Sequence, residues 1–409
     1  MDRVIVVSLW DARHPLREVQ LEELVGLVSA AGGMVVGFES QGRDNVRQGL
    51  GKGALERLAD QVTQLGVDLV VSDSELSPSL AAGWTAALPP NVRVVDRTQV
   101  ILDIFARRAS TREGKLQVEL AQLRYLLPRL STFGGSSERS GGGIGTRGPG
   151  ETPLELDRRR IHKRIQTLQE TLDAVSSERQ VRRQRRRETH IPQVALVGYT
   201  NVGKSTLFGR LSGYSPLVSD ALFVTLDPTV RRIEVPHYGP ALVFDTVGFV
   251  DRLPHTLVQA FHATLDEVRE ADLLVEVVDG SNGRAEEQRR ATDQVLREIG
   301  AESLDRMVVY TQADKVPEPE RQDSALWVSA VTGDGIDQFW RALAERLEIW
   351  RESLTLFLPW TDSQGWQAVS RHATILSRED EEEGSWLDVT VPTHRAEYFR
   401  TLSHPHKPG

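Results

Sequence analysis

A nine-residue stretch near the middle of the chain limits its possible folds more than any other feature. Residues 198–206 read Gly-Tyr-Thr-Asn-Val-Gly-Lys-Ser-Thr and match Gly-x-x-x-x-Gly-Lys-Ser, a loop whose backbone N–H groups wrap a polyphosphate. The apolar run Val194–Val197 predicts a buried strand before it, and Thr206–Leu211 predicts the start of a helix after it. Because this order also aims a helix N-terminus at the anion, the stretch predicts a nucleotide-binding α/β domain rather than a chance glycine-rich turn.

Two side chains of this loop have specific expected roles. Lys204 is expected to reach the β- and γ-phosphates, and Ser205 to hold Mg²⁺. The residues expected to contact the nucleotide here are Gly198, Tyr199, Thr200, Asn201, Val202, Gly203, Lys204, Ser205 and Thr206.

Two further segments are expected to complete the phosphate and metal site. Asp245 follows the apolar strand Ala241–Phe244 in an Asp-x-x-Gly arrangement, in which the carboxylate reaches Mg²⁺ and the N–H of Gly248 meets the γ-phosphate. Upstream, Thr225 is placed to coordinate Mg²⁺ when the γ-phosphate is present, and Thr229 is the weaker candidate for that role. The expected contacts are Phe223, Val224, Thr225, Leu226 and Asp227 in the first segment, and Asp245, Thr246, Val247 and Gly248 in the second.

The choice of base is expected to depend on the segment after the apolar strand Met307–Tyr310. Asp314 can accept two hydrogen bonds from N1–H and the amino group of guanine, a pair that adenine cannot supply. The wrong base would leave a buried carboxylate unpaired, so the sequence predicts a guanine nucleotide, GTP or GDP. The residues assigned to this pocket are Thr311, Gln312, Ala313 and Asp314, with Ser329, Ala330 and Val331 closing it.

Composition and charge further restrict the kinds of protein that this chain can be. The chain has 409 residues, no cysteine and a net charge of −9, which excludes disulfides and argues against a general nucleic-acid binder. No stretch is long and apolar enough for a membrane span, so a cytoplasmic protein without stable membrane insertion is expected. Residues 107–188 differ from the rest of the chain in being basic, with 17 Arg and 2 Lys against 10 acidic residues. This basic segment indicates either a local contact with a polyanion or a solvated, salt-bridged helix face, and charge alone does not decide between them.

The pattern along the chain predicts four domains of mixed α and β structure. In residues 1–110, apolar β-branched runs alternate with segments of helical spacing. This alternation predicts a small parallel α/β domain. Residues 111–190 predict an antiparallel helical hairpin, residues 191–352 the nucleotide domain with a mixed, mostly parallel sheet, and residues 353–409 a small α+β domain. An acidic run in the last domain, residues 379–383, is expected to be a solvated loop.

The hairpin is predicted from two leucine- and isoleucine-rich seams. Leucines recur at steps of four and three in residues 116–130, and apolar residues recur similarly in residues 161–175. A glycine-rich loop of about 20 residues joins the two helices and contains Arg139 and Arg147, which places basic side chains at the tip.

Three segments carry a family resemblance. Residues 141–152 read Gly-Gly-Gly-Ile-Gly-Thr-Arg-Gly-Pro-Gly-Glu-Thr and run into the arginine-rich helix start at Leu154–Arg160. Residues 223–229 read Phe-Val-Thr-Leu-Asp-Pro-Thr, and residues 245–249 read Asp-Thr-Val-Gly-Phe. On these segments the chain resembles the HflX ribosome-associated GTPases, within the translation-factor class, and its C-terminal 57 residues resemble them more loosely. The guanine element departs from the usual Asn-Lys-x-Asp, because Thr311 and Gln312 replace the first two residues; guanine preference is expected to survive with weaker affinity.

Two residues bear on the rate of hydrolysis. Many GTPases place glutamine after Asp-x-x-Gly to orient water, but Phe249 occupies that position here, so slow hydrolysis by the isolated chain is expected. In related GTPases an asparagine at the position of Asn201 helps to bind K⁺, and the resemblance implies the same ion here. The expected catalytic residues are Lys204, Asn201, Thr225 and Gly248, and the expected metal ligands are Ser205, Thr225 and Asp245.

The resemblance implies a GTP-switched factor that binds the large ribosomal subunit and its RNA and splits or rescues stalled or idle ribosomes. A monomer with no DNA partner is expected. An alternative is a signalling-type GTPase whose hairpin binds a protein, and a separate nucleotide site in the N-terminal domain also stays open.

Overall fold

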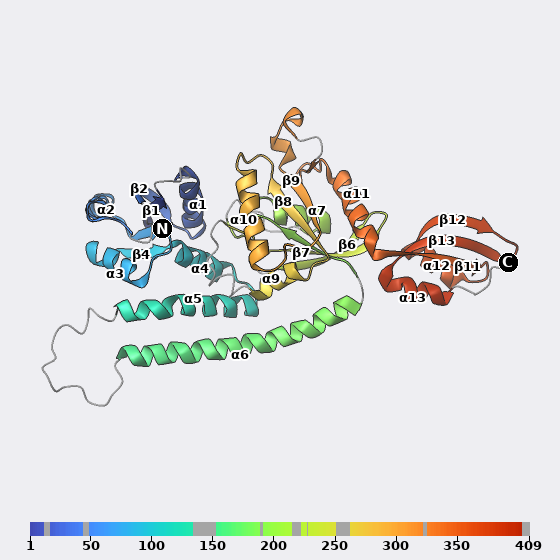
Figure 1. Ribbon diagram of the computed structural model, residues 1–409, viewed down its shortest axis with the longest axis horizontal. Coiled ribbons are helices and arrows are strands. Elements are labelled where there is room, and N and C mark those ends of the chain that lie inside the picture. Colours follow the sequence, from blue (N-terminus) through green and yellow to red (C-terminus); the bar gives the residue numbers. More distant parts are fainter. Residues whose placement is uncertain are drawn as a thin grey trace. The chain divides into compact units, whose positions relative to one another are not determined.

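The computed structural model describes most of the chain, in two compact units (Figure 1). The described residues are 1–11, 17–43, 49–133, 153–188, 191–214, 222–226, 228–250, 262–321 and 325–402. The first unit comprises residues 1–175 with 219–227 and 253–262, and the second comprises residues 176–218, 228–252 and 263–409. In the described part, no helix is both long and apolar enough to cross a membrane.

The first unit is built on a four-stranded sheet that is parallel throughout. Its strand order is β2-β1-β3-β4, and the bounds are β1 (Arg3–Asp11), β2 (Met34–Arg43), β3 (Leu69–Ser72) and β4 (Arg93–Asp96). The connecting helices are α1 (Arg17–Ala30), α2 (Lys52–Leu65), α3 (Pro78–Ala87) and α4 (Arg97–Arg108). The β-branched runs of β1 and β3 are buried, as fits parallel strands covered by helices. The predicted parallel α/β domain is confirmed.

Helix α5 (Arg112–Phe133) is anchored to this domain by a buried carboxylate. Asp96 accepts hydrogen bonds from the hydroxyl of Tyr125 (2.9 Å), the guanidinium of Arg129 (2.9 Å) and the N–H of Leu76 (3.0 Å). Arg129 also lies over the Tyr125 ring, 3.5 Å from its centroid. Burial, followed by the charge of Asp96, raises the pKa of the Tyr125 hydroxyl. The helix is therefore fixed by charge as well as by apolar packing.

Replacing Asp96 is expected to loosen α5. Asp96→Ala would leave the Arg129 guanidinium buried without its carboxylate, which costs about 3–5 kcal/mol. Hydrogen exchange of the α5 amides should accelerate by about 100-fold. The control is Asp157→Ala, which removes an exposed ion pair with Arg160 and should change little. Unchanged α5 exchange in Asp96→Ala would contradict this role.

Helix α6 (Pro153–Glu188) runs for 36 residues and forms the second arm of the hairpin. Along its predicted seam Leu168 is buried and Ile161, Ile165, Leu172 and Val175 are half-buried. Two hydrogen bonds, 2.6 and 2.8 Å, join the Arg164 guanidinium to Glu119 of α5. The predicted hairpin loop, with Arg139 and Arg147, lies outside the described residues.

The second unit contains a six-stranded sheet of order β10-β9-β8-β5-β7-β6, in which β6 alone is antiparallel to its neighbour. The strands are β5 (Gln193–Val197), β6 (Thr229–Val235), β7 (Gly239–Asp245), β8 (Leu273–Asp279), β9 (Arg306–Thr311) and β10 (Leu326–Trp327). The described helices are α7 (Lys204–Ser212), α9 (His262–Arg269), α10 (Ala285–Glu298) and α11 (Ile336–Leu347), with short 3-10 turns η3 (Ala313–Lys315), η4 (Glu318–Glu320) and η5 (Glu348–Trp350). This is the predicted mixed, mostly parallel sheet.

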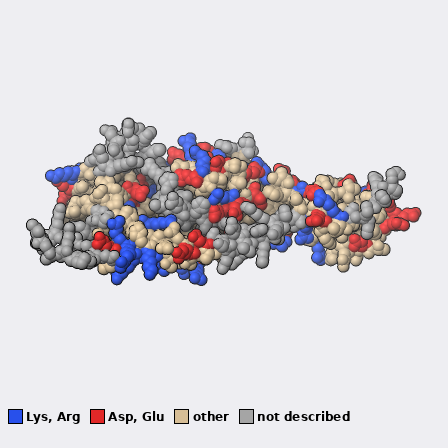
Figure 2. All heavy atoms as spheres, turned by 60° about the horizontal axis from the view of Figure 1, so that its bottom comes forward, with Lys and Arg blue, Asp and Glu red and all other residues tan. Residues whose placement is uncertain are grey.

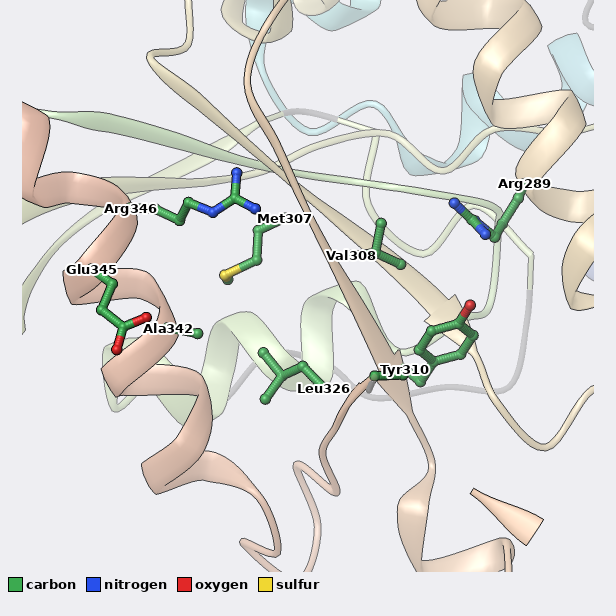
Figure 3. A pocket seen from close by; sticks show the side chains of 9 residues that line it. Arg289, Met307, Val308, Tyr310, Leu326, Ala342, Glu345 and Arg346 are labelled. Atoms are coloured by element: carbon green, nitrogen blue, oxygen red, sulfur yellow. The ribbon is translucent and has the colours of Figure 1, made fainter. Parts of the chain in front are cut away.

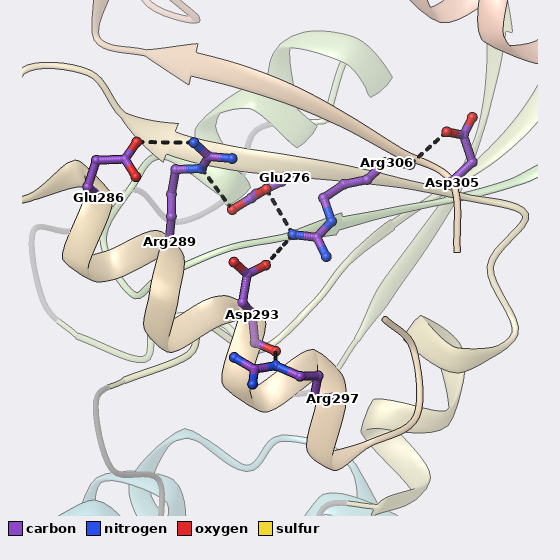
Figure 4. A network of polar contacts seen from close by, with 7 residues as sticks. All are labelled: Glu276, Glu286, Arg289, Asp293, Arg297, Asp305 and Arg306. Atoms are coloured by element: carbon purple, nitrogen blue, oxygen red, sulfur yellow. Dashed lines mark hydrogen bonds and ion pairs between the residues drawn. The ribbon is translucent and has the colours of Figure 1, made fainter. Parts of the chain in front are cut away.

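A buried acid on the central strand β8 fixes α10 to this sheet (Figure 4). Glu276 is fully buried and lies 3.4 Å from Arg289 of α10 and 3.3 Å from Arg306 of β9. Arg306 also pairs with Asp293, and Arg289 pairs with Glu286 at 3.1 Å. The buried charge is therefore compensated, as a structural network requires.

The C-terminal residues form a small antiparallel sheet of order β11-β13-β12. The elements are β11 (Arg351–Pro359), β12 (Thr374–Asp380), β13 (Gly384–Pro392), α12 (Ser363–His372) and α13 (Thr393–Leu402). This confirms the small α+β domain. The expected loop at residues 379–383 is wrong in part: Glu379 and Asp380 belong to β12, and the Glu381 N–H donates to the Gly384 carbonyl, closing a hairpin.

Candidate functional site

The predicted site residues of the second unit gather where the central parallel strands end. Strand β5 leads into the phosphate loop, β7 ends at Asp245, and β9 ends at Thr311. Asp245 pairs in register with Leu196 of β5. The carboxyl ends of parallel strands share one edge of a sheet, which is where α/β folds bind ligands. The topology thus brings together segments that are more than 100 residues apart in sequence.

Two glycines give the phosphate loop its shape. Gly198 has a φ of 146°, and a Cβ there would lie 2.3 Å from the carbonyl oxygen of Val277. Gly203 has a φ of 92° and immediately precedes α7. Asn201 adopts a φ of 62°, in the left-handed region that asparagine tolerates better than most residues. Only glycine fits at position 198. Because glycine has no side chain, the backbone can turn sharply there around a polyphosphate.

Lys204 is buried at the start of α7 with its charge directed into its own loop. Its ammonium donates to the carbonyl oxygens of Tyr199 (2.6 Å) and Gly198 (3.1 Å). Burial lowers its pKa to about 8, and the nearby Asp245 partly opposes that shift. Phosphate oxygens would compensate this charge more fully than two carbonyl dipoles do.

Nucleotide affinity is therefore expected to decrease as the pH rises through 8. Below pH 8 Lys204 is charged and attracts phosphate, whereas above it binding must first take up a proton. The Kd for GDP should rise about fourfold between pH 7 and 8.5, measured by fluorescence titration. In Lys204→Met the affinity should be lower and independent of pH over this range. A Kd that stays constant in the unmodified chain would contradict the assigned role of Lys204.

The Asp-x-x-Gly segment lies against the phosphate loop. Phe249 is buried, and its N–H donates to the Gly198 carbonyl (3.0 Å), while its carbonyl accepts from the Thr200 N–H (2.7 Å). A methyl group at Gly248 would lie 3.0 Å from Nζ of Lys204 and 2.8 Å from Cγ2 of Thr200. The phosphate loop and residues 245–249 therefore form one continuous site.

Thr225 belongs to a different unit from the phosphate loop. Residues 219–227 are part of the first unit, where the buried Phe223 packs edge-on against Phe105 at a centroid distance of 4.8 Å. Leu226 is buried, Val224 is half-buried, and Asp227 lies outside the described residues. The structure thus does not bring Thr225 together with Ser205 and Asp245 in one unit. Thr229, the weaker candidate, pairs in register with Asp245.

The predicted base pocket begins with Thr311, whose hydroxyl contacts both the phosphate loop and strand β8. The buried hydroxyl of Thr311 lies 2.6 Å from the Val202 carbonyl oxygen and 3.0 Å from that of Val278. Gln312 has a φ of 59°, and its amide donates to Asp279 (2.8 Å) while its carbonyl accepts from Lys315 (2.6 Å). Sequence reasoning missed Asp279 and Lys315, although the position of Asp279 at the end of β8 was a usable signal.

Asp314, which the sequence predicts to recognise guanine, is oriented by a buried serine. The hydroxyl of Ser329 donates to Oδ1 of the exposed Asp314 at 2.6 Å. Ala313 is buried, Ala330 is half-buried, and Val331 is 75 % exposed.

A separate cavity of about 450 Å³ lies at the outer edge of the sheet, between α10 and α11 (Figure 3). Met307, Tyr310 and Leu326 line it, with Arg289 and Arg346 at its ends. Both arginines are paired, with Glu276 and Asp305 respectively. No residue of the phosphate loop contributes to it, so it is not the nucleotide site.

Fold and site together define a P-loop GTPase. Family models match residues 18–106 (GTP-binding GTPase N-terminal), 108–186 (GTP-binding GTPase Middle Region) and 193–312 (50S ribosome-binding GTPase). The GTPase HflX of Caldanaerobacter subterraneus is 40% identical over 98% of this chain and 94% of its own length. That of Escherichia coli is 42% identical over 88% and 86%, respectively. The chain belongs to the HflX family of GTPases.

Among solved structures, a GTP-binding protein of Sulfolobus solfataricus in complex with GDP is similar. The match covers 85% of this chain and 98% of that chain, at 22% identity and a TM-score of 0.43. That similarity is too distant to bear on the ligand of this chain.

Proposed function

We propose that this GTPase binds GTP and GDP through residues 198–206, 245–248, 311–314 and 329–331, and that it acts on the large ribosomal subunit in the cytoplasm as a monomer. The observation that supports the nucleotide site is the buried Lys204, which lies beside Gly248 and Asp245 at the carboxyl edge of the sheet. Slow turnover alone and stimulation by ribosomes follow from Phe249, whose buried ring cannot orient water.

Mg²⁺ fits the residues at this edge. Asp245 supplies a buried carboxylate and Ser205 a hydroxyl in the first turn of α7. Within the described residues no group of three His, Cys, Asp or Glu forms a metal cage. Mg²⁺ is usually held by one or two carboxylates together with substrate phosphates, so a cage is not required. Bound Mg²⁺ would neutralise charge on the phosphates.

A K⁺ ion is the proposed second cation, with Asn201 as a ligand. Asn201 is exposed within the phosphate loop, so its amide oxygen can face a hydrated ion. GTP turnover should be at least about fivefold faster in K⁺ than in Na⁺, because the added charge stabilises the transition state. In Asn201→Ala the two salts should give equal rates. Equal rates in the unmodified chain, with and without ribosomes, would contradict the ion site.

The basic face of the hairpin supports a ribosomal RNA partner. Figure 2 shows Lys and Arg side chains gathered over this part of the chain. On α6 the exposed residues include Arg158, Arg159, Arg160 and Lys163. Helix arginines of this kind bind phosphate backbones through charge. The description of the family model, a 50S ribosome-binding GTPase, supports the same partner. Ribosome splitting or rescue is the proposed outcome of binding.

Sedimentation with purified large subunits tests the partner. Binding should be stronger with a non-hydrolysable GTP analogue than with GDP, and it should weaken at higher salt. Replacing Arg158, Arg159 and Arg160 with glutamine should reduce binding by about tenfold, whereas Arg371→Gln on the C-terminal α12 serves as a matched control. Binding that survives the triple replacement would contradict the role of the hairpin. Equal binding with both nucleotides would contradict the switch.

A further inference from the structure

We propose that the hydroxyl of Thr200 is a catalytic group in GTP hydrolysis, donating a hydrogen bond to a γ-phosphoryl oxygen as charge develops on it. The inference rests on the nucleotide site proposed above. Other GTPases use a glutamine at the position of Phe249 to orient the attacking water. The apolar ring of Phe249 can form hydrogen bonds neither to the water nor to the phosphoryl oxygens, so another group must supply them.

Thr200 differs from the other buried threonines around the site. It is 4 % exposed, and within the described residues its Oγ1 has no hydrogen-bond partner. Thr246 is equally buried but donates to the Leu196 carbonyl at 2.6 Å, and Thr311 donates to the Val202 carbonyl at the same distance. Buried hydroxyls are normally paired because an unpaired one is costly. An exception in the phosphate loop points to a partner that arrives with the nucleotide.

The position of Thr200 places it beside the groups that are expected to meet the γ-phosphate. A methyl group at Gly248 would lie 2.8 Å from both Cα and Cγ2 of Thr200 and 3.0 Å from Nζ of Lys204. These three residues therefore converge on one small region. A rotation of about 120° around χ1 moves Oγ1 of a threonine into the position that Cγ2 held and moves Cγ2 into the position of the Cβ hydrogen, so the hydroxyl can occupy the place that the methyl group holds.

The backbone fixes this arrangement. Thr200 donates its N–H to the Phe249 carbonyl at 2.7 Å, and Phe249 donates its N–H to the Gly198 carbonyl at 3.0 Å. These two bonds hold Thr200 directly beside position 249. A hydroxyl on the loop thus lies next to the position at which other GTPases supply a glutamine side chain.

The chemistry requires no proton transfer from threonine. The oxygen of water forms a bond to the γ-phosphorus while the bond from that phosphorus to the β–γ bridging oxygen breaks, giving GDP and inorganic phosphate. The protons lost by the water end on the phosphate products or in solvent. Thr200 keeps its proton and donates a hydrogen bond that strengthens as charge on the γ-oxygens is redistributed.

Three variants separate catalysis from binding. Thr200→Val removes the hydroxyl at nearly equal volume, Thr200→Ser keeps it, and Thr355→Val makes the same change in the C-terminal sheet. Single-turnover hydrolysis of GTP should be about 10- to 100-fold slower in Thr200→Val, within about threefold of normal in Thr200→Ser, and unchanged in Thr355→Val. The Kd values for GDP and for a non-hydrolysable GTP analogue should stay within about twofold in all three.

Stability supplies an independent measurement. Thr200→Val removes an unpaired hydroxyl, so its thermal unfolding should occur at the same or a higher temperature, and Thr200→Ala repeats the kinetic test if valine is not tolerated. Normal hydrolysis in Thr200→Val or Thr200→Ala would overturn the inference. So would a loss of nucleotide affinity that matches the loss of rate, since the hydroxyl would then act in ground-state binding. Retained nucleotide affinity in Lys204→Ala would instead overturn the proposed nucleotide site.

Discussion

Lys204→Ala should abolish nucleotide binding at concentrations that saturate the unmodified chain. The change removes a buried ammonium whose charge-assisted hydrogen bonds to phosphate are worth about 1.5–3 kcal/mol each, and more than one such bond is expected. The Kd for GTP and GDP should therefore rise by at least about 100-fold, as measured by fluorescence titration.

The fold should tolerate this variant. Lys204 is bound by carbonyl dipoles of its own loop, and burial already lowers its pKa, so removal of its charge should not destabilise the protein. The matched control is Lys115→Ala on α5, an exposed lysine of the first unit, which should leave affinity unchanged. Near-normal affinity in Lys204→Ala would show that residues 198–206 do not hold the nucleotide.

Asp314→Asn should change the base preference from guanine to xanthine. Asparagine places an amide donor opposite a guanine donor, which removes one hydrogen bond and leaves two donors facing each other. GTP affinity should fall by about 100-fold. Xanthine has a carbonyl where guanine has its amino group, so XTP can accept from the new amide. The Ser329 hydroxyl can still donate to the remaining side-chain oxygen, which keeps the residue oriented.

Competition between GTP, ATP and XTP for the two proteins measures this preference. The unmodified chain should prefer GTP over ATP, and Asp314→Asn should prefer XTP over both. Asp334→Asn is the matched control, because Asp334 lies on the neighbouring loop and pairs with Arg321. Equal binding of GTP and ATP by the unmodified chain would contradict the guanine assignment itself.

Local sequence patterns were enough to predict the main elements of the four-stranded and six-stranded sheets. The apolar run Val194–Val197 is the core of β5, and the glycine and lysine that follow dictate a loop and a helix N-terminus without help from the rest of the chain. The long helix α6 follows from its start at Pro153 and its regular apolar spacing. These are local properties of the chain, so one sequence suffices to predict them.

Long-range pairing could not be predicted. The Asp96–Arg129 ion pair that fixes α5 joins residues 33 positions apart, and nothing in the spacing marks them as partners. The hydrogen bond from the Gln312 amide to Asp279 likewise depends on where β8 and β9 end in space. The packing of Phe223 with the first unit depends on an aromatic partner, Phe105, from a distant helix.

The most direct measurement of the central claim is GTP turnover by this 409-residue chain with and without purified large ribosomal subunits. A buried phenylalanine beside the phosphate loop predicts slow hydrolysis by the chain alone, and the proposed partner should raise the rate by at least about tenfold. Free small subunits should have no effect. Fast hydrolysis by the isolated chain, or a rate that large subunits leave unchanged, would contradict a GTPase whose turnover depends on the ribosome.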